Sequence, residues 1–421
     1  MISRYHLLCP GCSEKFIARI GVEPTNGTRF YLLCPECRLA IKGAITGTEF
    51  SEHRVTFECD VLNQSHPDLP DAMTVTINPF VPSLYEADSY SPVGAFPTMT
   101  LVRILGEDDF MAFENERHAG LDAIDEMWPS TQMLFRYFLQ DNQKMFSKLS
   151  SEKFGLDWEP NTAHQRTSVA YQALLHVTAV VVGSTGSESE RITRRFSRKY
   201  SAAIRHKNHL MAMRERGALA SHLERDIFTE IDRFITQHDT WEMGRLVRFL
   251  RRQSSADLET LTLYRDEFSI VRDLYQQGFE LACKCLWPLV ATQNSVKRQD
   301  PNDFGDHHPD PSIVPLNKRP KTLKQFDKLS NAYKIAYVTQ VPGWESLGTL
   351  LDNRQRNTIG HATAHHDLQT GRIVSDIDSH GIAYLDFLSL TFGVFEALTV
   401  LAQVLRAARV ASSPDFFKEE S

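Results

Sequence analysis

The chain has 421 residues, of which 42% are hydrophobic and 24% are charged, which excludes a fibrous or intrinsically disordered protein. This length corresponds to roughly two to three domains, enough to bury a sizeable core. The formal net charge of -7 provides no overall positive field for nucleic acid, so any such binding requires a local basic patch.

Residues 1–48 hold two Cys-Pro-x-Cys pairs among short runs that predict β-strands and turns. Cys9 with Cys12, and Cys34 with Cys37, can each form a tight knuckle whose thiolates point at one ion. Four thiolates satisfy the tetrahedral preference of Zn(II) and close its coordination shell, so the sequence predicts a zinc ribbon with a structural Zn(II). A redox dithiol would not normally occur twice, whereas an iron–sulfur site shares this ligand set and stays an alternative.

Residues 49–117 predict a β-rich connector. Two apolar runs with β-branched residues, Met73–Ile77 and Met99–Ile104, predict strands, and several prolines separate them. The other three cysteines lack further ligands nearby and are interpreted as core or idle thiols: Cys59, Cys283 and Cys285.

Residues 118–256 form a helical region to which the sequence assigns no role. From residue 118 the apolar period becomes helical, and helices are predicted over 118–150, 162–183, 187–236 and 240–253. A basic run over 191–216, with Phe196 and Tyr200 interleaved, is typical of a solvated helix face and also of a surface that follows an RNA backbone. The candidate RNA-contacting residues of this run are Arg194, Arg195, Arg198 and Lys199.

Residues 257–411 read as a second helical domain, followed by a polar tail over 412–421. A helix is predicted over 257–292, with Asp257 able to cap its first turn. A Pro- and Asp-rich stretch at 293–320 predicts a long loop. After it, the sequence predicts helices over 321–339 and 344–351, a hairpin around 369–374 and a long apolar helix.

That last helix contains the 19 residues from Phe387 to Leu405, whose only charged residue is Glu396. This length is close to that of a membrane span, but small and polar residues recur every three to four positions. A buried bundle helix is therefore favoured over a span. The N-terminus lacks a basic region followed by an apolar run, so the expected location is cytoplasmic, with no membrane attachment.

The segment 352–367 contains Arg356-Asn357, with His361 five positions after the arginine. It resembles the Arg-x(4 to 6)-His signature of the HEPN (higher eukaryote and prokaryote nucleotide-binding) ribonuclease family, in which a polar residue usually follows the arginine. An arginine followed by a histidine at a spacing within this signature also occurs at Arg216 with His222 and at Arg233 with His238. Only Arg356 carries the adjacent asparagine, and only this segment follows helices and precedes a hairpin and a long apolar helix, as in that family.

This resemblance implies a HEPN-like helical bundle over roughly 257–411. The expected fold is therefore mainly α, with a helical middle region and a small N-terminal β zinc ribbon. If the segment is helical, His361 and His365 share a face with Asn357, whereas Arg356 lies about 140° away from His361 around the axis. A homodimer that crosses two such helices near Gly360 could unite both sets in a composite site, as the family is understood to do.

The chemistry implied is metal-independent cleavage of an RNA substrate by attack of the ribose 2′-hydroxyl on the adjacent phosphorus. The resemblance assigns His361 as acid or base, Arg356 as the stabiliser of phosphate charge, and Asn357 as the residue that orients them. Arg354, His365 and His366 are secondary candidates. A capped helix with a surface histidine is the ordinary interpretation of the same residues, and a His361–His365 metal site is the weaker alternative.

Three functions follow as expectations. The first is a dimeric endoribonuclease that acts as a toxin or antiphage abortive-infection effector, with an antitoxin or sensor protein as partner. The second is a non-catalytic zinc-ribbon and HEPN regulator that binds nucleic acid or protein. The third is a membrane-attached effector that uses the apolar helix.

Overall fold

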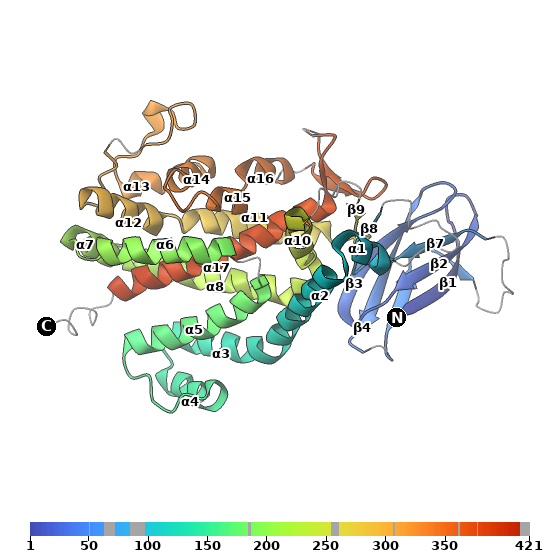
Figure 1. Ribbon diagram of the computed structural model, residues 1–421, viewed down its shortest axis with the longest axis horizontal. Helices are drawn as coiled ribbons and strands as arrows, with labels where there is room; N and C mark the ends of the chain where they lie inside the picture. Colours follow the sequence, from blue (N-terminus) through green and yellow to red (C-terminus); the bar gives the residue numbers. More distant parts are fainter. Residues whose placement is uncertain are drawn as a thin grey trace. The chain divides into compact units, whose positions relative to one another are not determined.

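The computed structural model describes residues 1–49, 51–62, 72–84, 97–183, 187–253, 261–305, 308–360, 363–376 and 378–412. The chain divides into two compact units. Unit 1 comprises residues 1–114, 237–273 and 354–392, and unit 2 comprises residues 115–236, 274–353 and 393–421. The chain is mainly helical and has a small β region at its N-terminus, as the sequence predicts (Figure 1).

Unit 1 contains all the strands. In the described chain they are β1 (Ile2–Leu8), β2 (Lys15–Gly21), β3 (Thr25–Leu33), β4 (Ala40–Gly47), β5 (Arg54–Phe57), β6 (Val61–Leu62), β7 (Thr74–Ile77), β8 (Ser83–Leu84), β9 (Leu261–Thr262), β10 (His365–Asp367), β11 (Arg372–Val374) and β12 (Ile382–Ala383). They form sheets in the orders β6-β1-β2-β7, β3-β4-β5, β8-β9 and β10-β11-β12. The first two sheets thus combine strands from residues 1–48 with strands from beyond residue 48.

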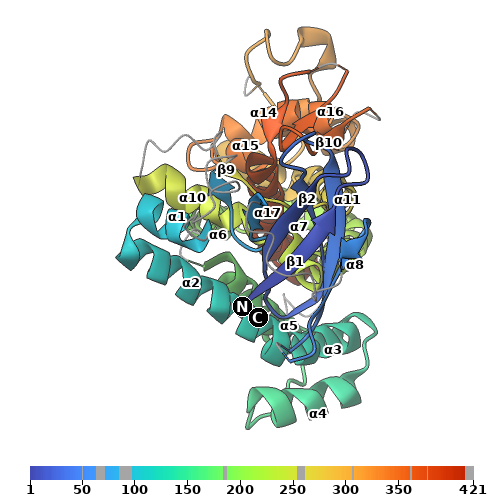
Figure 2. The same ribbon diagram turned by 90° about the vertical axis from the view of Figure 1, so that its right-hand side faces the viewer.

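Strands β1 and β2 run antiparallel, from the pair Ile2 and Gly21 to the pair Leu8 and Lys15 (Figure 2). Strand β7 adds to β2 in parallel and confirms the strand predicted at Met73–Ile77. Its Val75 and Ile77 side chains are almost fully buried, because β-branched residues fill the covered face of a sheet well.

The second strand predicted in the connector is wrong, because the run from Met99 to Ile104 lies in a helix, α1 (Pro97–Leu105). The buried residues of α1 are Pro97, Thr100, Leu101 and Leu105, which recur at helical spacing. Pro97 stands at the first position of the helix, where its missing N–H costs nothing. Its β-branched residues had indicated a strand, yet burial of one helical face decides the structure.

Helix α2 (Glu107–Asp122) continues from unit 1 into unit 2. Further helices of unit 1 are α9 (His238–Trp241), α10 (Gly244–Gln253) and α16 (Asn353–Ile359). Helix α10 confirms the helix predicted over 240–253 with a later start. The predicted hairpin around 369–374 is confirmed by β10 and β11, which pair antiparallel.

Unit 2 is built of helices. They are a π-helical turn (Ala123–Met127), α3 (Trp128–Leu139), α4 (Gln143–Phe154), α5 (Ala163–Val182), α6 (Ser187–Ala203), α7 (Lys207–Glu215), α8 (Gly217–Thr236), α11 (Phe268–Lys284), α12 (Trp287–Arg298), a 3₁₀ turn (Leu316–Lys318), α13 (Leu323–Phe326), α14 (Asn331–Thr339), α15 (Leu347–Leu350) and α17 (Tyr384–Ser412). Helices α11 and α17 begin in unit 1. A full capping box between Thr162 and Gln165 starts α5 where the sequence predicts a helix.

The helix predicted over 257–292 starts later than expected. Residues 254–260, including the proposed cap Asp257, lie outside the described residues, and residues 261–262 form β9 instead. The helix begins at Phe268 and is interrupted between α11 and α12. The loop predicted from residue 293 accordingly begins only after Arg298.

The core of unit 2 combines aromatic rings with one buried ion pair. Phe135 stacks on Phe228 with ring centroids 4.4 Å apart and meets Tyr171 edge-on. The Tyr171 hydroxyl donates to Glu224 at 2.7 Å, and Arg409 reaches the other oxygen of that carboxylate at 2.7 Å. These partners compensate the buried carboxylate, which joins α5, α8 and α17.

Helix α17 contains the apolar stretch that the sequence flagged. Within the described chain it is the one helix long and apolar enough to cross a membrane, and 89% of its most apolar window is buried in the protein. Glu396 is fully buried, and the Ser189 hydroxyl donates to it within unit 2. This burial agrees with the predicted bundle helix.

Candidate functional sites

The two cysteine knuckles have the same local structure. Each lies in the turn of an antiparallel strand pair, β1–β2 for the first and β3–β4 for the second. The fifth residue of each knuckle donates its N–H to the carbonyl of the first cysteine at 3.0 Å, from Ser13 to Cys9 and from Arg38 to Cys34. Ser13 and Arg38 both have left-handed backbone angles, with φ of 61° and 64°. Two hairpins therefore present their thiols in the same way.

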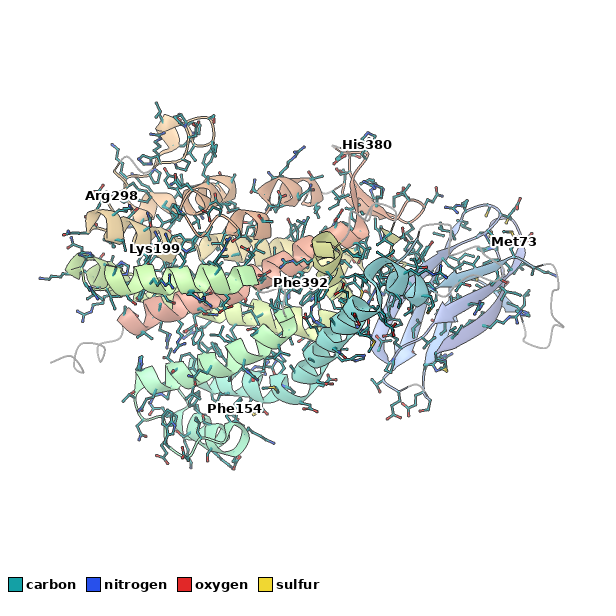
Figure 3. All side chains as sticks on the ribbon, in the orientation of Figure 1. Met73, Phe154, Lys199, Arg298, His380 and Phe392 are labelled. Atoms are coloured by element: carbon teal, nitrogen blue, oxygen red, sulfur yellow. The ribbon has the colours of Figure 1, made fainter. Side chains whose placement is uncertain are left out.

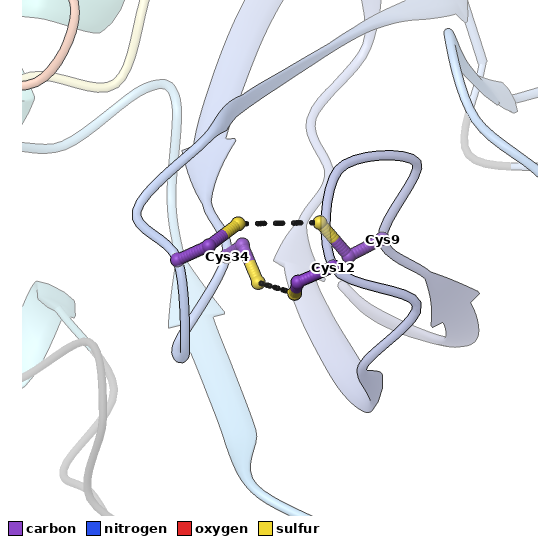
Figure 4. Close-up of side chains that lie close together, drawn as sticks. Cys9, Cys12 and Cys34 are labelled. Carbon is purple, nitrogen blue, oxygen red and sulfur yellow. Dashed lines mark hydrogen bonds between the residues drawn. The ribbon is translucent and has the colours of Figure 1, made fainter.

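The four thiols of the knuckles converge, as the sequence predicts. Their Sγ atoms all lie within 4.8 Å of one another and could hold a metal ion. The Cys9–Cys37 and Cys12–Cys34 separations are both 3.6 Å (Figure 4). A disulfide has a sulfur–sulfur distance of about 2.0 Å, so these cysteines are free thiols that can act as four ligands.

The surroundings of the thiols favour ionisation of one of them. Burial opposes the charge on Cys9, but N–H groups of Cys12 and Gly11 and the neighbouring thiols outweigh it and lower the pKa of Cys9 to about 7. Burial raises the pKa of Cys34 to about 12. A bound cation would lower the pKa of each coordinating thiol, so loading of the site would release protons.

The structure describes part of the Arg-Asn-x3-His segment. Arg356 and Asn357 lie in the last turns of α16, and Arg356 Nη1 donates to Asn357 Oδ1 at 3.3 Å. The Arg356 side chain is half-buried, and Asn357 is exposed. His361 lies outside the described residues. The structure thus brings the predicted arginine and asparagine together.

The helical geometry considered for this segment is wrong beyond Ile359. Helix α16 ends there, Gly360 occupies an exposed turn, and His365 lies in strand β10. Asn357 and His365 therefore do not share a helix face, and Gly360 follows the end of the helix. Arg354 is exposed at the start of α16, and its carbonyl accepts a hydrogen bond from Thr358.

The hairpin after α16 has one polar face. Because side chains alternate along a strand, His365 and Asp367 of β10 share a face with their partners Val374 and Arg372 of β11. A pocket of about 360 Å³ opens on this face and is lined by Asp367, Thr370, Arg372, Val374, Ser379 and His380.

The turn that closes this pocket was missed by the sequence interpretation. Arg372 donates to the carbonyls of His380 at 2.8 Å and Gly381 at 3.1 Å, and thereby fixes the turn. Gly381 has a φ of +59°, and a Cβ there would lie 1.9 Å from the Ile373 carbonyl oxygen, so only glycine fits. His380 is exposed at this turn (Figure 3). The polar run from Ser375 to Gly381 is the sequence signal for it.

This turn is tied to the chain segment that follows His361. The N–H of Asp376 donates to Thr363 Oγ1 at 3.3 Å, and the Thr363 carbonyl lies 3.0 Å from His365 Nδ1. The imidazole of His365 and the turn with His380 therefore lie beside Thr363.

The opposite face of the hairpin is packed. The His366 ring stacks on Tyr384 with centroids 4.5 Å apart and meets Tyr31 edge-on at 5.7 Å. Neither ring nitrogen of His366 has a hydrogen-bond partner among the described residues. Burial lowers the pKa of His366 to about 4, although Asp266 and Asp367 act in the opposite direction.

The stability of the protein should therefore fall in acid through His366. The unfolded chain takes up this proton below about pH 6.5, whereas the folded protein resists it down to about pH 4. The contribution is thus present above pH 6.5 and is lost as the pH falls towards 4. His366→Phe keeps a ring against Tyr384 and removes the titrating group. In urea unfolding at pH 7 and pH 4.5, the wild type should lose about 2–3 kcal/mol more than the variant. Equal losses would contradict this assignment.

Two of the basic side chains on α6 are paired with acidic residues. Arg191 pairs with Glu188 at 2.6 Å, and Arg194 pairs with Glu190. Arg195 and Arg198 are exposed. Lys199, which is labelled in Figure 3, is half-buried.

The two aromatic residues of this run are not placed to stack on RNA bases. Phe196 is 2% exposed, and the Tyr200 hydroxyl donates to the Ala407 carbonyl at 2.7 Å. The predicted interleaving of basic and aromatic contacts is therefore wrong for these two rings. Phe196 belongs to the core of unit 2, and Tyr200 is half-buried against α17.

No protein-family model, no curated protein and no solved structure matches the chain.

Proposed function

We propose that the protein is a metal-independent endoribonuclease of the HEPN type, with Arg356, Asn357 and His361 at its site. The observation that supports this most directly is the contact between Arg356 Nη1 and Asn357 Oδ1 at 3.3 Å. The neutral amide oxygen of Asn357 accepts one N–H of the guanidinium without cancelling its positive charge. This is the orienting role that the family resemblance gives to the asparagine.

In the proposed reaction the ribose 2′-hydroxyl attacks the adjacent phosphorus, and the 5′-oxygen leaves. The products carry 2′,3′-cyclic phosphate and 5′-hydroxyl ends. Arg356 braces the additional negative charge on the phosphorane with its fork of donors. His361 takes or gives the proton, since an imidazole with an ordinary pKa near 6.5 can do both at neutral pH.

A second protomer completes the proposed site. Helix α16 is only two turns long, and Asn357 and Gly360 at its end are exposed. Two such ends facing each other in a homodimer would place two arginines and two histidines around one phosphate. We infer a toxin or antiphage effector in the cytoplasm, restrained by an antitoxin or sensor protein, because this is the habit of the family that the segment resembles.

The metal of the cysteine cluster is proposed to be a structural Zn(II). Four sulfur atoms about 2.3 Å from a tetrahedral Zn(II) are about 3.8 Å from one another. The two closest cross-knuckle separations, each 3.6 Å, fit this value. With Cys9, Cys12, Cys34 and Cys37 as ligands the coordination shell is closed, so the ion would hold the β region together and take no part in catalysis.

The test of the proposed reaction compares cleavage of mixed RNA by the wild type, Arg356→Ala and His361→Ala, without divalent ions and with EDTA present. Each variant should lose activity about 100-fold, the usual effect of removing a positioned proton-transfer or charge-stabilising group. Arg191→Ala is the matched control, because Arg191 is an exposed arginine already paired with Glu188. The unfolding transition is followed in the same buffer, since EDTA can also remove a structural metal. Equal activity in all four proteins would refute the proposal.

A second candidate is a non-catalytic regulator that binds nucleic acid or protein through the cysteine knuckles. The observation that favours it is Leu39, a large apolar residue that is 40% exposed directly after the second knuckle. Binding without RNA cleavage, insensitive to His361→Ala and lost in Cys34→Ser, would support this function over the first.

A further inference from the structure

Unit 2 has a cluster of basic side chains that, unlike two neighbouring basic side chains of α6, are not paired with acidic residues of the described chain. Arg195 and Lys199 stand four residues apart on α6 and therefore share a face of the helix. Helix α12 packs beside α6 and carries Gln293 and Lys297, also four residues apart (Figure 1). In the part of the chain that the structure describes, Arg195, Lys199 and Lys297 have no carboxylate partner.

Lys199 occupies the centre of this cluster. Its Nζ donates to Gln293 Oε1 at 2.5 Å and lies 5.3 Å from the centre of the Trp344 ring. Burial, and then the charges of Arg195 and Lys297, lower the pKa of Lys199 to about 8. The protein thus holds three cations close enough to repel one another.

The side chains around Lys199 are held in place by packing against a backbone turn. The Arg195 stem packs against the turn at Gly343, where φ is +91° and a Cβ would lie 2.9 Å from Arg195 Cγ. The acid of that turn, Glu345, accepts a hydrogen bond from the Gly343 N–H at 2.8 Å. The buried indole N–H of Trp344 has no acceptor among the described residues. An anion would relieve the repulsion and supply acceptors.

We propose that Arg195, Lys199 and Lys297 form a binding site for a phosphate group. A phosphate carries up to two charges and several acceptor oxygens, which suits a guanidinium fork and two ammonium groups better than a carboxylate does. The phosphate can belong to a free oligophosphate or to the backbone of single-stranded RNA. The site does not depend on RNA cleavage, since every residue in it lies outside the Arg356 segment.

The experiment titrates pyrophosphate into the full-length protein and follows the heat of binding. Arg195→Gln and Lys297→Gln should each weaken binding about tenfold, because each removes one charge-assisted contact. Arg194→Gln is the matched control: it is the next residue on the same helix, but Glu190 already pairs with it. It should bind as the wild type does. All three positions are exposed, so the variants should fold normally.

A second measurement locates the ligand. Lys199 should be acetylated by a limiting amine-reactive reagent faster than the exposed Lys144, and pyrophosphate should protect it in the wild type but not in Arg195→Gln. If a short single-stranded RNA displaces pyrophosphate, the phosphate belongs to an RNA backbone. If the RNA does not displace pyrophosphate, the phosphate belongs to a free oligophosphate. The proposal fails if pyrophosphate does not bind, binds equally to all variants, or leaves Lys199 unprotected. The ribonuclease proposal is unaffected by any of these results.

Discussion

Replacing Cys34 with serine is expected to abolish binding of the proposed structural Zn(II) and cooperative folding of the β region of unit 1. Cys34 is fully buried, and its own N–H and carbonyl are hydrogen-bonded within the knuckle, which fixes its thiol at the cluster. Apparent binding energies of structural zinc sites are about 10–16 kcal/mol, comparable to or larger than the whole stability of a domain. The variant should therefore lose more stability than any surface substitution could remove.

The measurement combines metal analysis of the purified chain with hydrogen exchange of peptides from residues 1–62. The wild type should contain one zinc per chain and protect β1 to β4, whereas Cys34→Ser should contain none and exchange rapidly there. Cys59→Ser is the matched control, because Cys59 is a half-buried thiol outside the cluster. It should keep its metal and lose about 1 kcal/mol or less. A wild type without metal that melts together with Cys34→Ser would exclude the structural role.

The knuckles could be predicted because their determinants are local. Four cysteines at short spacing and the turn residues beside them specify two hairpins without information about the rest of the chain. The same holds for the β10–β11 hairpin and for α17, which contains a long apolar stretch from Phe387 to Leu405. In each case the sequence contains both the element and the reason for its burial.

The elements that were wrong depend on distant partners. Met99–Ile104 is rich in β-branched residues, but burial of Thr100, Leu101 and Leu105 on one side makes it a helix. Phe196 and Tyr200 look accessible in a basic run, and only the packing of unit 2 shows that Phe196 is a core residue and that the Tyr200 hydroxyl bonds the Ala407 carbonyl. Local sequence cannot show which face of a helix the rest of the chain will cover.

For the candidate ribonuclease site, the sequence predicted some contacts and missed others. The contact of Arg356 with Asn357 follows from adjacency, whereas the end of α16 at Ile359 separates His365 from the helix face considered for it. His380 was missed because it is distant in sequence and reaches the hairpin only through the turn that Arg372 fixes.

Arg265→Met should destabilise unit 1 by about 3–5 kcal/mol, the cost of leaving a buried charge without its partner. Arg265 is 1% exposed, and its Nε and Nη2 atoms lie 2.9 Å and 2.8 Å from Glu267 Oε2. Burial opposes the charge of Arg265, but Glu267 and Asp239 outweigh it and raise its pKa. Methionine fills the volume of the side chain but leaves both carboxylates without this cation.

The pair also fixes the chain segment that contains it. Glu267 Oε1 accepts the N–H of Arg29 at 3.1 Å, and the Asp266 N–H donates to the Arg29 carbonyl at 3.1 Å, so residues 265–267 add to β3. The double variant Arg265→Met, Glu267→Gln removes the charge and keeps an acceptor for Arg29. It should recover part of the lost stability, because a neutral replacement of the Arg265–Glu267 pair is close to neutral, whereas Asp239 still lacks the cation.

Urea unfolding of the wild type, the single variant and the double variant measures these differences. Lys42→Met is the control, since its 2.7 Å pair with Asp266 adjoins the same segment but its side chain is 42% exposed. It should cost less than about 1 kcal/mol, as exposed ion pairs do. If Arg265→Met costs no more than Lys42→Met, the buried pair does not hold β3 to this segment. If the double variant is as unstable as the single one, the loss comes from packing and not from an unpaired carboxylate.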